Sequence, residues 1–161
     1  MHTLHTKIDH ADTIDDQLVL PYELREKCRL RAQLASGEEV AVFTQRGTVL
    51  RDGDLLTGES GQVVQVVAAP EPTYRVACTH AHMLLRCAFH LGNRHTQAQL
   101  GDGFLRIRVD PVLREMLLGL GASVEAEFAP FEPESGAYAV PHTHALAPVP
   151  LRQKIHRPGE P

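Results

Sequence analysis

The stretch that decides the fold runs from residue 73 to residue 128 and reads TYRVACTHAHMLLRCAFHLGNRHTQAQLGDGFLRIRVDPVLREMLLGLGASVEAEF. Two segments within it place apolar residues at helical spacing. Four other runs have the short apolar pattern of strands, at 73–79, 97–100, 104–109 and 123–128. The order strand, helix, strand, strand, helix, strand predicts a ferredoxin-like βαββαβ domain.

The first predicted helix follows Thr79, whose hydroxyl can cap a helix N-terminus. Gly92 is expected to be the left-handed residue that ends this helix, so that the run to His95 turns away from the helix axis. The predicted apolar stripe of the helix consists of Ala81, Leu84, Leu85, Ala88 and Leu91.

The second predicted helix begins at Asp110-Pro111, which supplies an N-cap side chain and a proline at the first helical position. Gly121 is expected to close the helix. Its predicted apolar stripe consists of Val112, Leu113, Met116, Leu117 and Leu120.

The N-terminal half has a different pattern, in which short apolar runs alternate with turn signals that contain glycine. Strands are predicted at 18–22, 28–34, 39–44, 48–50, 54–57 and 62–69. We expect them to form a small sandwich or partly open barrel. The predicted fold class is therefore α+β, with a flexible N-terminal segment (1–17), an all-β domain (18–72), the ferredoxin-like domain (73–140) and a flexible tail (141–161).

The composition of the chain argues against several classes of function. The formal net charge of −4 at pH 7 disfavours binding to nucleic acid, which depends on an excess of Lys and Arg. The apolar runs are far shorter than the roughly 18–20 residues that cross a bilayer, so no membrane association is expected. The N-terminus lacks the pattern of a secretory signal, and three cysteines without a CxxC pair do not form a disulfide framework. A cytoplasmic location is expected.

Ten histidines are the unusual feature, because histidine is the commonest metal-ligating side chain. His142 and His144 lie two residues apart, so in an extended tail they can approach one ion together. His95 has no second donor close to it in sequence, so a site there must recruit ligands from another segment or another subunit. The others are interpreted as solvated surface residues, both on the first predicted helix (His80, His82, His90) and in the N-terminal segment (His2, His5, His10).

Four further stretches can be compared with known families, namely EEVAVFTQRGTVLRDGDLL (38–56), HLGNRH (90–95), DPVLREMLLGLG (110–121) and APFEPESGAY (129–138). Together they resemble the UreE family of nickel-binding urease accessory proteins. The resemblance runs from about residue 18 to residue 144, and its most specific part is GNRH followed by PFEPE-x-GAY.

The resemblance implies a cytoplasmic, homodimeric metallochaperone that delivers Ni²⁺ for urease active-site assembly and has no catalytic activity. Its expected partners are the urease accessory GTPase and the apo-urease maturation complex. The principal metal ligand of the family corresponds to His95, held between subunits, and the tail ligands of some members correspond to His142 and His144. The β domain is implied to be of a peptide-binding type. Zn²⁺ and Cu²⁺ suit the same imidazole donors as Ni²⁺.

Two other interpretations stay open from the sequence. The β half can be a peptide-binding chaperone module of the urease maturation complex, in which case metal binding is incidental. Cys78 and His80 suggest an enzyme with a thiolate nucleophile, although no GxSxG, HExxH or Walker A motif accompanies them.

Overall fold

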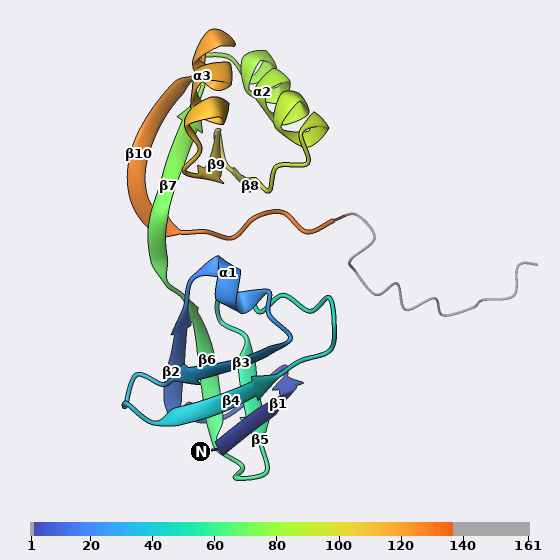
Figure 1. The fold of residues 1–161 in the computed structure, drawn as a ribbon, viewed down its shortest axis with the longest axis vertical. Coiled ribbons are helices and arrows are strands. Elements are labelled where there is room, and N and C mark those ends of the chain that lie inside the picture. Colours follow the sequence, from blue (N-terminus) through green and yellow to red (C-terminus); the bar gives the residue numbers. More distant parts are fainter. Residues whose placement is uncertain (1, 137–161) are drawn as a thin grey trace, which may run out of the picture.

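The computed structural model describes residues 2–136, which form two domains stacked end to end (Figure 1). The N-terminal domain contains β1 (His2–Ile8), β2 (Asp16–Leu20), α1 (Tyr22–Arg25), β3 (Arg29–Gln33), β4 (Glu39–Phe43), β5 (Leu55–Gly58) and β6 (Val63–Ala68). The C-terminal domain contains β7 (Pro70–Ala77), α2 (Ala81–Asn93), β8 (Gln99–Gly101), β9 (Phe104–Arg108), α3 (Pro111–Gly119) and β10 (Ser123–Pro130). The predicted α+β class is confirmed.

The N-terminal domain is one curled sheet of six strands in the order β2-β6-β5-β1-β4-β3. Strands β2 and β6 alternate buried residues with more exposed ones, and the buried residues of the sheet fill the inside of the curl. The two ends of the sheet approach each other, since the N–H of Ala35 after β3 donates to the Gln17 carbonyl of β2 at 2.9 Å. The domain is therefore nearly closed. Its fully buried core residues include Leu4, Leu18, Val40, Val42, Leu50, Val64 and Val66.

The prediction of a flexible N-terminal segment over 1–17 is wrong for its first part. Strand β1 pairs in parallel with β4 and antiparallel with β5, and the side chain of Leu4 is fully buried. The exposed positions of β1 are histidine, threonine and lysine, so a single buried leucine did not stand out as a strand pattern. The predicted tail, 141–161, lies outside the described residues.

Two further boundaries differ from the predictions. Residues 48–50 are not a strand, although Leu50 is fully buried. Strand β7 begins at Pro70, earlier than predicted, and includes Pro72. Its pairing with β9 begins at Thr73, so residues 70–72 pair with β10 alone. Proline has no backbone N–H, and it is tolerated there because no second neighbouring strand needs that N–H as a hydrogen-bond donor.

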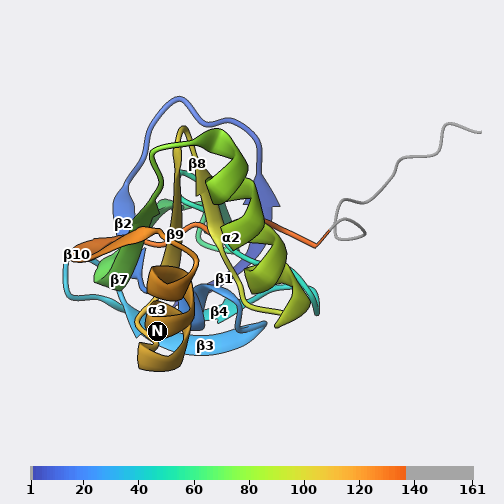
Figure 2. The ribbon, with the colours of Figure 1, turned by 90° about the horizontal axis from the view of Figure 1, so that it is seen from above.

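The C-terminal domain is ferredoxin-like, as predicted. Its antiparallel sheet has the strand order β10-β7-β9-β8, and α2 and α3 lie side by side on one face of it (Figures 1 and 2). On the opposite face, Arg75 and Arg106 lie over the ring of Phe104, and Arg106 pairs with Glu127 at 2.6 Å. The core between sheet and helices consists of Val76, Cys87, Leu91, Leu105, Ile107, Leu117 and Ala122.

Arg25 joins the two domains. Its side chain is fully buried and donates to the carbonyls of Leu20 and Leu50 in the β domain, both at 3.1 Å. It also donates to the carbonyl of Phe131 and pairs with the Glu132 carboxylate, both in the segment that follows β10. The chain therefore returns from the C-terminal domain to the β domain and is held there.

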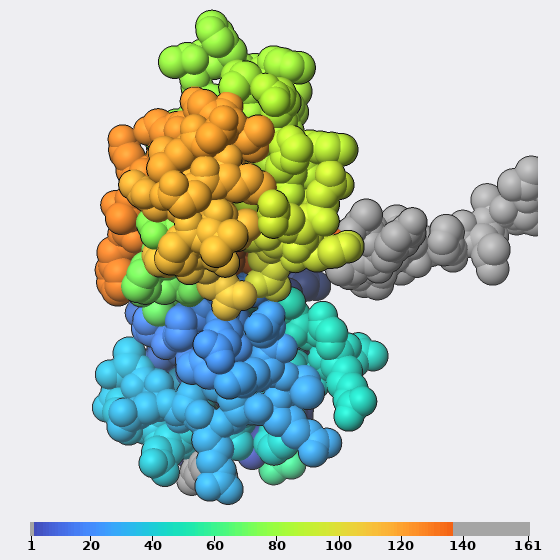
Figure 3. Space-filling view, turned by 45° about the horizontal axis from the view of Figure 1, so that its top comes forward, coloured from blue at the N-terminus to red at the C-terminus, as the bar shows by residue number. Residues whose placement is uncertain are grey.

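Other contacts extend this junction. Arg51 donates to the Pro133 carbonyl at 2.7 Å and to the Ser135 hydroxyl at 2.8 Å. The ring of Tyr22 packs edge-on against that of Phe131, with centroids 5.4 Å apart. On the face shown in Figure 3, the side chains of the two domains meet directly. Among residues 2–136, no helix is long and apolar enough to cross a membrane.

We expect Arg25→Met to lower the free energy of unfolding by about 3 kcal/mol, because it leaves the partly buried Glu132 and three carbonyls without their donor. Urea unfolding followed by circular dichroism measures the change. Arg29→Met is the matched control, since Arg29 is exposed on β3, and we expect it to change stability by less than about 0.5 kcal/mol. Equal effects of the two substitutions would contradict the role assigned to Arg25.

Candidate metal centre

Helix α2 ends in a Schellman motif whose left-handed residue is His95. The N–H of Thr96 donates to the Leu91 carbonyl at 3.1 Å, and the N–H of His95 donates to the Gly92 carbonyl at 2.9 Å. These two bonds define the motif. The φ angle of His95 is 54°, and no other non-glycine residue among residues 2–136 has a positive φ.

Helix α3 ends in the same motif, but there the left-handed residue is a glycine. The N–H of Ala122 donates to the Leu117 carbonyl and that of Gly121 to the Leu118 carbonyl, each at 3.0 Å, and φ of Gly121 is 88°. The prediction that Gly121 closes this helix is confirmed. Glycine adopts this conformation without steric cost, whereas a side chain such as that of His95 costs about 1 kcal/mol.

The prediction that Gly92 ends α2 is wrong, because the helix continues through Asn93. The buried side chain of Leu91 anchors the last turn in the core. A Schellman motif places its left-handed residue four positions after this anchor, which is His95. At the other end of α2 the N-cap is His80 and not Thr79, and no side chain caps the helix.

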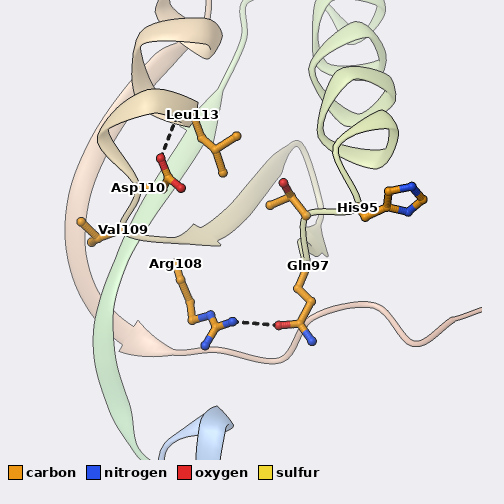
Figure 4. A pocket seen from close by; sticks show the side chains of 7 residues that line it. His95, Gln97, Arg108, Val109, Asp110 and Leu113 are labelled. Carbon is orange, nitrogen blue, oxygen red and sulfur yellow. Dashed lines mark hydrogen bonds between the residues drawn. The ribbon is translucent and has the colours of Figure 1, made fainter.

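His95 is exposed and projects from the surface. It borders a hollow of about 620 Å³ that is lined by His95, Thr96, Gln97, Arg108, Val109, Asp110 and Leu113. In Figure 4 its imidazole points away from Arg108 and Asp110, so neither of these two side chains occupies its ring nitrogens. The motif fixes the backbone of His95, so the imidazole projects from a fixed Cα position.

Several polar side chains at or near this hollow have partners already. Arg108 donates to the Gln97 side-chain carbonyl at 3.1 Å (Figure 4). The Asp110 carboxylate accepts from the N–H groups of Val112 and Leu113 at 2.8 and 3.0 Å, as predicted for the N-cap of α3. Arg94 lies with Nε 3.1 Å from the Met116 sulfur. Among the described residues that line this hollow, His95 is the one whose side chain carries an imidazole nitrogen that can ligate a metal.

The remaining histidines do not converge on His95 in the described part of the chain. Among residues 2–136, no three side chains of the types His, Cys, Asp and Glu are grouped to hold a metal ion. His80, the N-cap of α2, and His82 on α2 are exposed, as predicted, and His90 is half-buried beside Phe89. The predicted ligands His142 and His144, and also His156, lie outside the described residues.

Exposed apolar side chains on the helices are the feature that the sequence analysis missed. Leu85 and Val112, assigned to the core-facing stripes, are 69% and 70% exposed, and Phe89 is 64% exposed. The core face of α2 instead carries Leu84, Cys87, Ala88 and Leu91. Helical periodicity cannot separate two adjoining apolar faces when one of them stays uncovered. Large exposed apolar residues that lie together mark interaction surfaces.

Comparison with known proteins gives a consistent result. The model of the UreE urease accessory protein N-terminal domain matches residues 1–69, and that of its C-terminal domain matches residues 71–158. The urease accessory protein UreE of Janthinobacterium sp. (strain Marseille) is 65% identical over 167 residues, which cover 99% of this chain and 98% of that protein. That of Nitrosospira multiformis is 60% identical over 172 residues, with the same coverage. That of Pseudomonas putida (strain W619) is 49% identical over 145 residues, which cover 89% of this chain and 90% of that protein.

We expect His95→Gly to raise the free energy of unfolding of the metal-free protein by about 1 kcal/mol, because glycine removes the strain of the left-handed conformation. His95→Ala removes the same imidazole but keeps a β-carbon, so it should not stabilise the protein. Urea unfolding of both variants measures the difference. Gly121→Ala is the reverse substitution in the second motif and should destabilise the protein. Equal stabilities of the two His95 variants would contradict a strained backbone at this position.

Proposed function

The chain belongs to the UreE family of urease accessory proteins, and we propose that it is a metallochaperone that carries Ni²⁺ to the urease active site during its assembly. As a urease accessory protein it is not an enzyme. The observation that carries the proposal is the exposed imidazole of His95, which the Schellman motif of α2 displays in a left-handed conformation. Ni²⁺ is the cargo in this function and not a resident cofactor.

Two copies of the chain supply the ligands that one copy lacks. In a two-fold symmetric dimer, a residue near the axis lies opposite the same residue of the other chain. His95 of each chain then provides one imidazole nitrogen, so that a pair of ligands arises from a single histidine in the sequence. His142 and His144 are the further donors in this proposal, and they complete the coordination of the ion from the tail.

The exposed apolar residues of α2 support this pairing. Leu85 and Phe89 lie one helical turn apart and form what we call the α2 patch. Phe89 lies four residues before Asn93, the last residue of α2, which is about 6 Å along the helix axis, and His95 follows two residues later. A second copy that covers the α2 patch therefore brings its own α2 close to His95. The apolar contact contributes to association, and the histidine pair supplies the metal site.

An exposed site with few ligands suits a carrier that must release its cargo. Imidazole binds Cu²⁺ more tightly than Ni²⁺, so His95 and the tail histidines do not by themselves select nickel. The site is open to an incoming partner, which can replace the ligands one at a time. We therefore propose that the ion leaves by ligand exchange with the urease accessory GTPase. The exchange takes place in the cytoplasm, where the GTPase is in complex with apo-urease.

Calorimetric titration with Ni²⁺, with the mass of each species recorded in parallel, tests the proposed ligands. We expect one tightly bound ion per dimer in the wild type. His95→Gly should abolish this binding and keep the helix end folded, whereas the double substitution His142→Ala/His144→Ala should weaken the binding by about tenfold. His5→Ala is the control, because His5 is exposed on β1 of the other domain, and it should bind as the wild type does. Tight binding that survives His95→Gly would refute the proposal.

Sedimentation of the metal-free protein tests the dimer surface. We expect Phe89→Ser to weaken the dimer at least tenfold, because it removes the largest side chain of the α2 patch. Phe128→Ser is the matched control, since Phe128 is 71% exposed on β10, outside that patch. A dimer that is weakened by Phe128→Ser and not by Phe89→Ser would place the interface elsewhere.

A further inference from the structure

Two cysteines lie close together in the C-terminal domain, between β7 and α2. Cys78 follows β7, and Cys87 lies in the middle of α2 on the face that packs against the sheet. Their sulfur atoms are 3.9 Å apart. Neither residue has a part in the proposed metal site.

The two thiols differ in their access to solvent. Cys87 is fully buried, and its burial, reinforced by the neighbouring Cys78, raises its pKa to about 11. Cys78 is half-buried and borders a surface hollow of about 280 Å³, together with Ala77, Thr79, Gly121 and Ser123. A small reagent can therefore reach the sulfur of Cys78, while Cys87 is reachable through Cys78 alone. The thiolate is the reactive form of cysteine, and the high pKa keeps Cys87 protonated.

We propose that Cys78 and Cys87 are a reversible oxidation site, which hydrogen peroxide converts to an intramolecular disulfide. The Cys78 thiolate attacks one oxygen of the peroxide, the O–O bond breaks, and hydroxide leaves and takes up a proton to form water. The resulting sulfenic acid is then attacked by the Cys87 sulfur. The S–S bond forms, and the Cys87 proton leaves with the hydroxyl group as a second water. Two thiols are oxidised to one disulfide, and one peroxide is reduced to two waters.

The geometry allows this reaction without unfolding. The sulfur atoms must approach from 3.9 Å to about 2.05 Å. Cys87 is fixed in a helix, but Cys78 stands at the start of the connection between β7 and α2, where Thr79 and His80 are exposed. The movement therefore falls on Cys78. The new bond ties the end of β7 to the middle of α2, and a dithiol reductant restores both thiols.

Peptide mapping of the metal-free protein after treatment with hydrogen peroxide tests the proposal. Trypsin cleaves after Arg75, Arg86 and Arg94, so the two cysteines fall in separate peptides, 76–86 and 87–94. We expect these peptides to be linked when the digest is not reduced, and the intact chain to lose the mass of two hydrogens. Cys28, which lies in the β domain, is an internal control and should remain a thiol.

Two variants distinguish this mechanism from unspecific oxidation. In Cys87→Ala the sulfenic acid has no partner, so Cys78 should proceed to the sulfinic acid, which the reductant does not reverse. In Cys78→Ser the buried Cys87 should stay unmodified. The oxidised wild type should also unfold at a higher temperature than the reduced protein and return to the lower value with reductant. Sulfinic acid at Cys78 of the wild type without any 78–87 link, or oxidation of Cys28 at an equal rate, would overturn the proposal.

Discussion

The buried guanidinium of Arg25 is the contact on which the arrangement of the two domains depends. A charge that is removed from water must be paired and fully hydrogen-bonded. Arg25 meets this condition with acceptors on both sides of the junction, namely the carbonyls of Leu20 and Leu50 in the β domain, and the Phe131 carbonyl and the Glu132 carboxylate in the segment after β10. The segment after β10 is thereby held against the β domain.

The junction also positions the segment that follows α2, next to His95. The chain from α2 to β8 passes over the domain boundary, where the Gln97 side chain donates to the Tyr22 hydroxyl at 3.3 Å. The same glutamine accepts from Arg108 at the edge of the hollow beside His95. The residues next to the candidate site are therefore positioned by contacts with both domains, and the site lies where the two meet. A docked partner can touch both of them at once.

The contrast between His95 and Gly121 gives the candidate site its physical interpretation. Both residues occupy the same position of the same helix-terminating motif, one in α2 and one in α3. The motif needs a left-handed residue, and glycine satisfies it at no cost. A histidine there is unfavourable for stability alone. A strained residue at a helix end is more readily understood as a binding residue than as a structural one.

The sequence alone determined the order of elements in the ferredoxin-like domain, the N-cap at Asp110 and the glycine at Gly121, because these features depend on neighbours within a few residues. The GNRH motif, which contains His95, can also be read directly from the sequence. The tertiary structure decided which apolar residues are buried, since Leu85 and Leu84 have the same periodicity and only packing against the sheet separates them. It likewise decided the pairing of β1, the burial of Arg25 and the approach of Cys78 to Cys87. These depend on contacts between residues far apart in the chain, which local pattern does not encode.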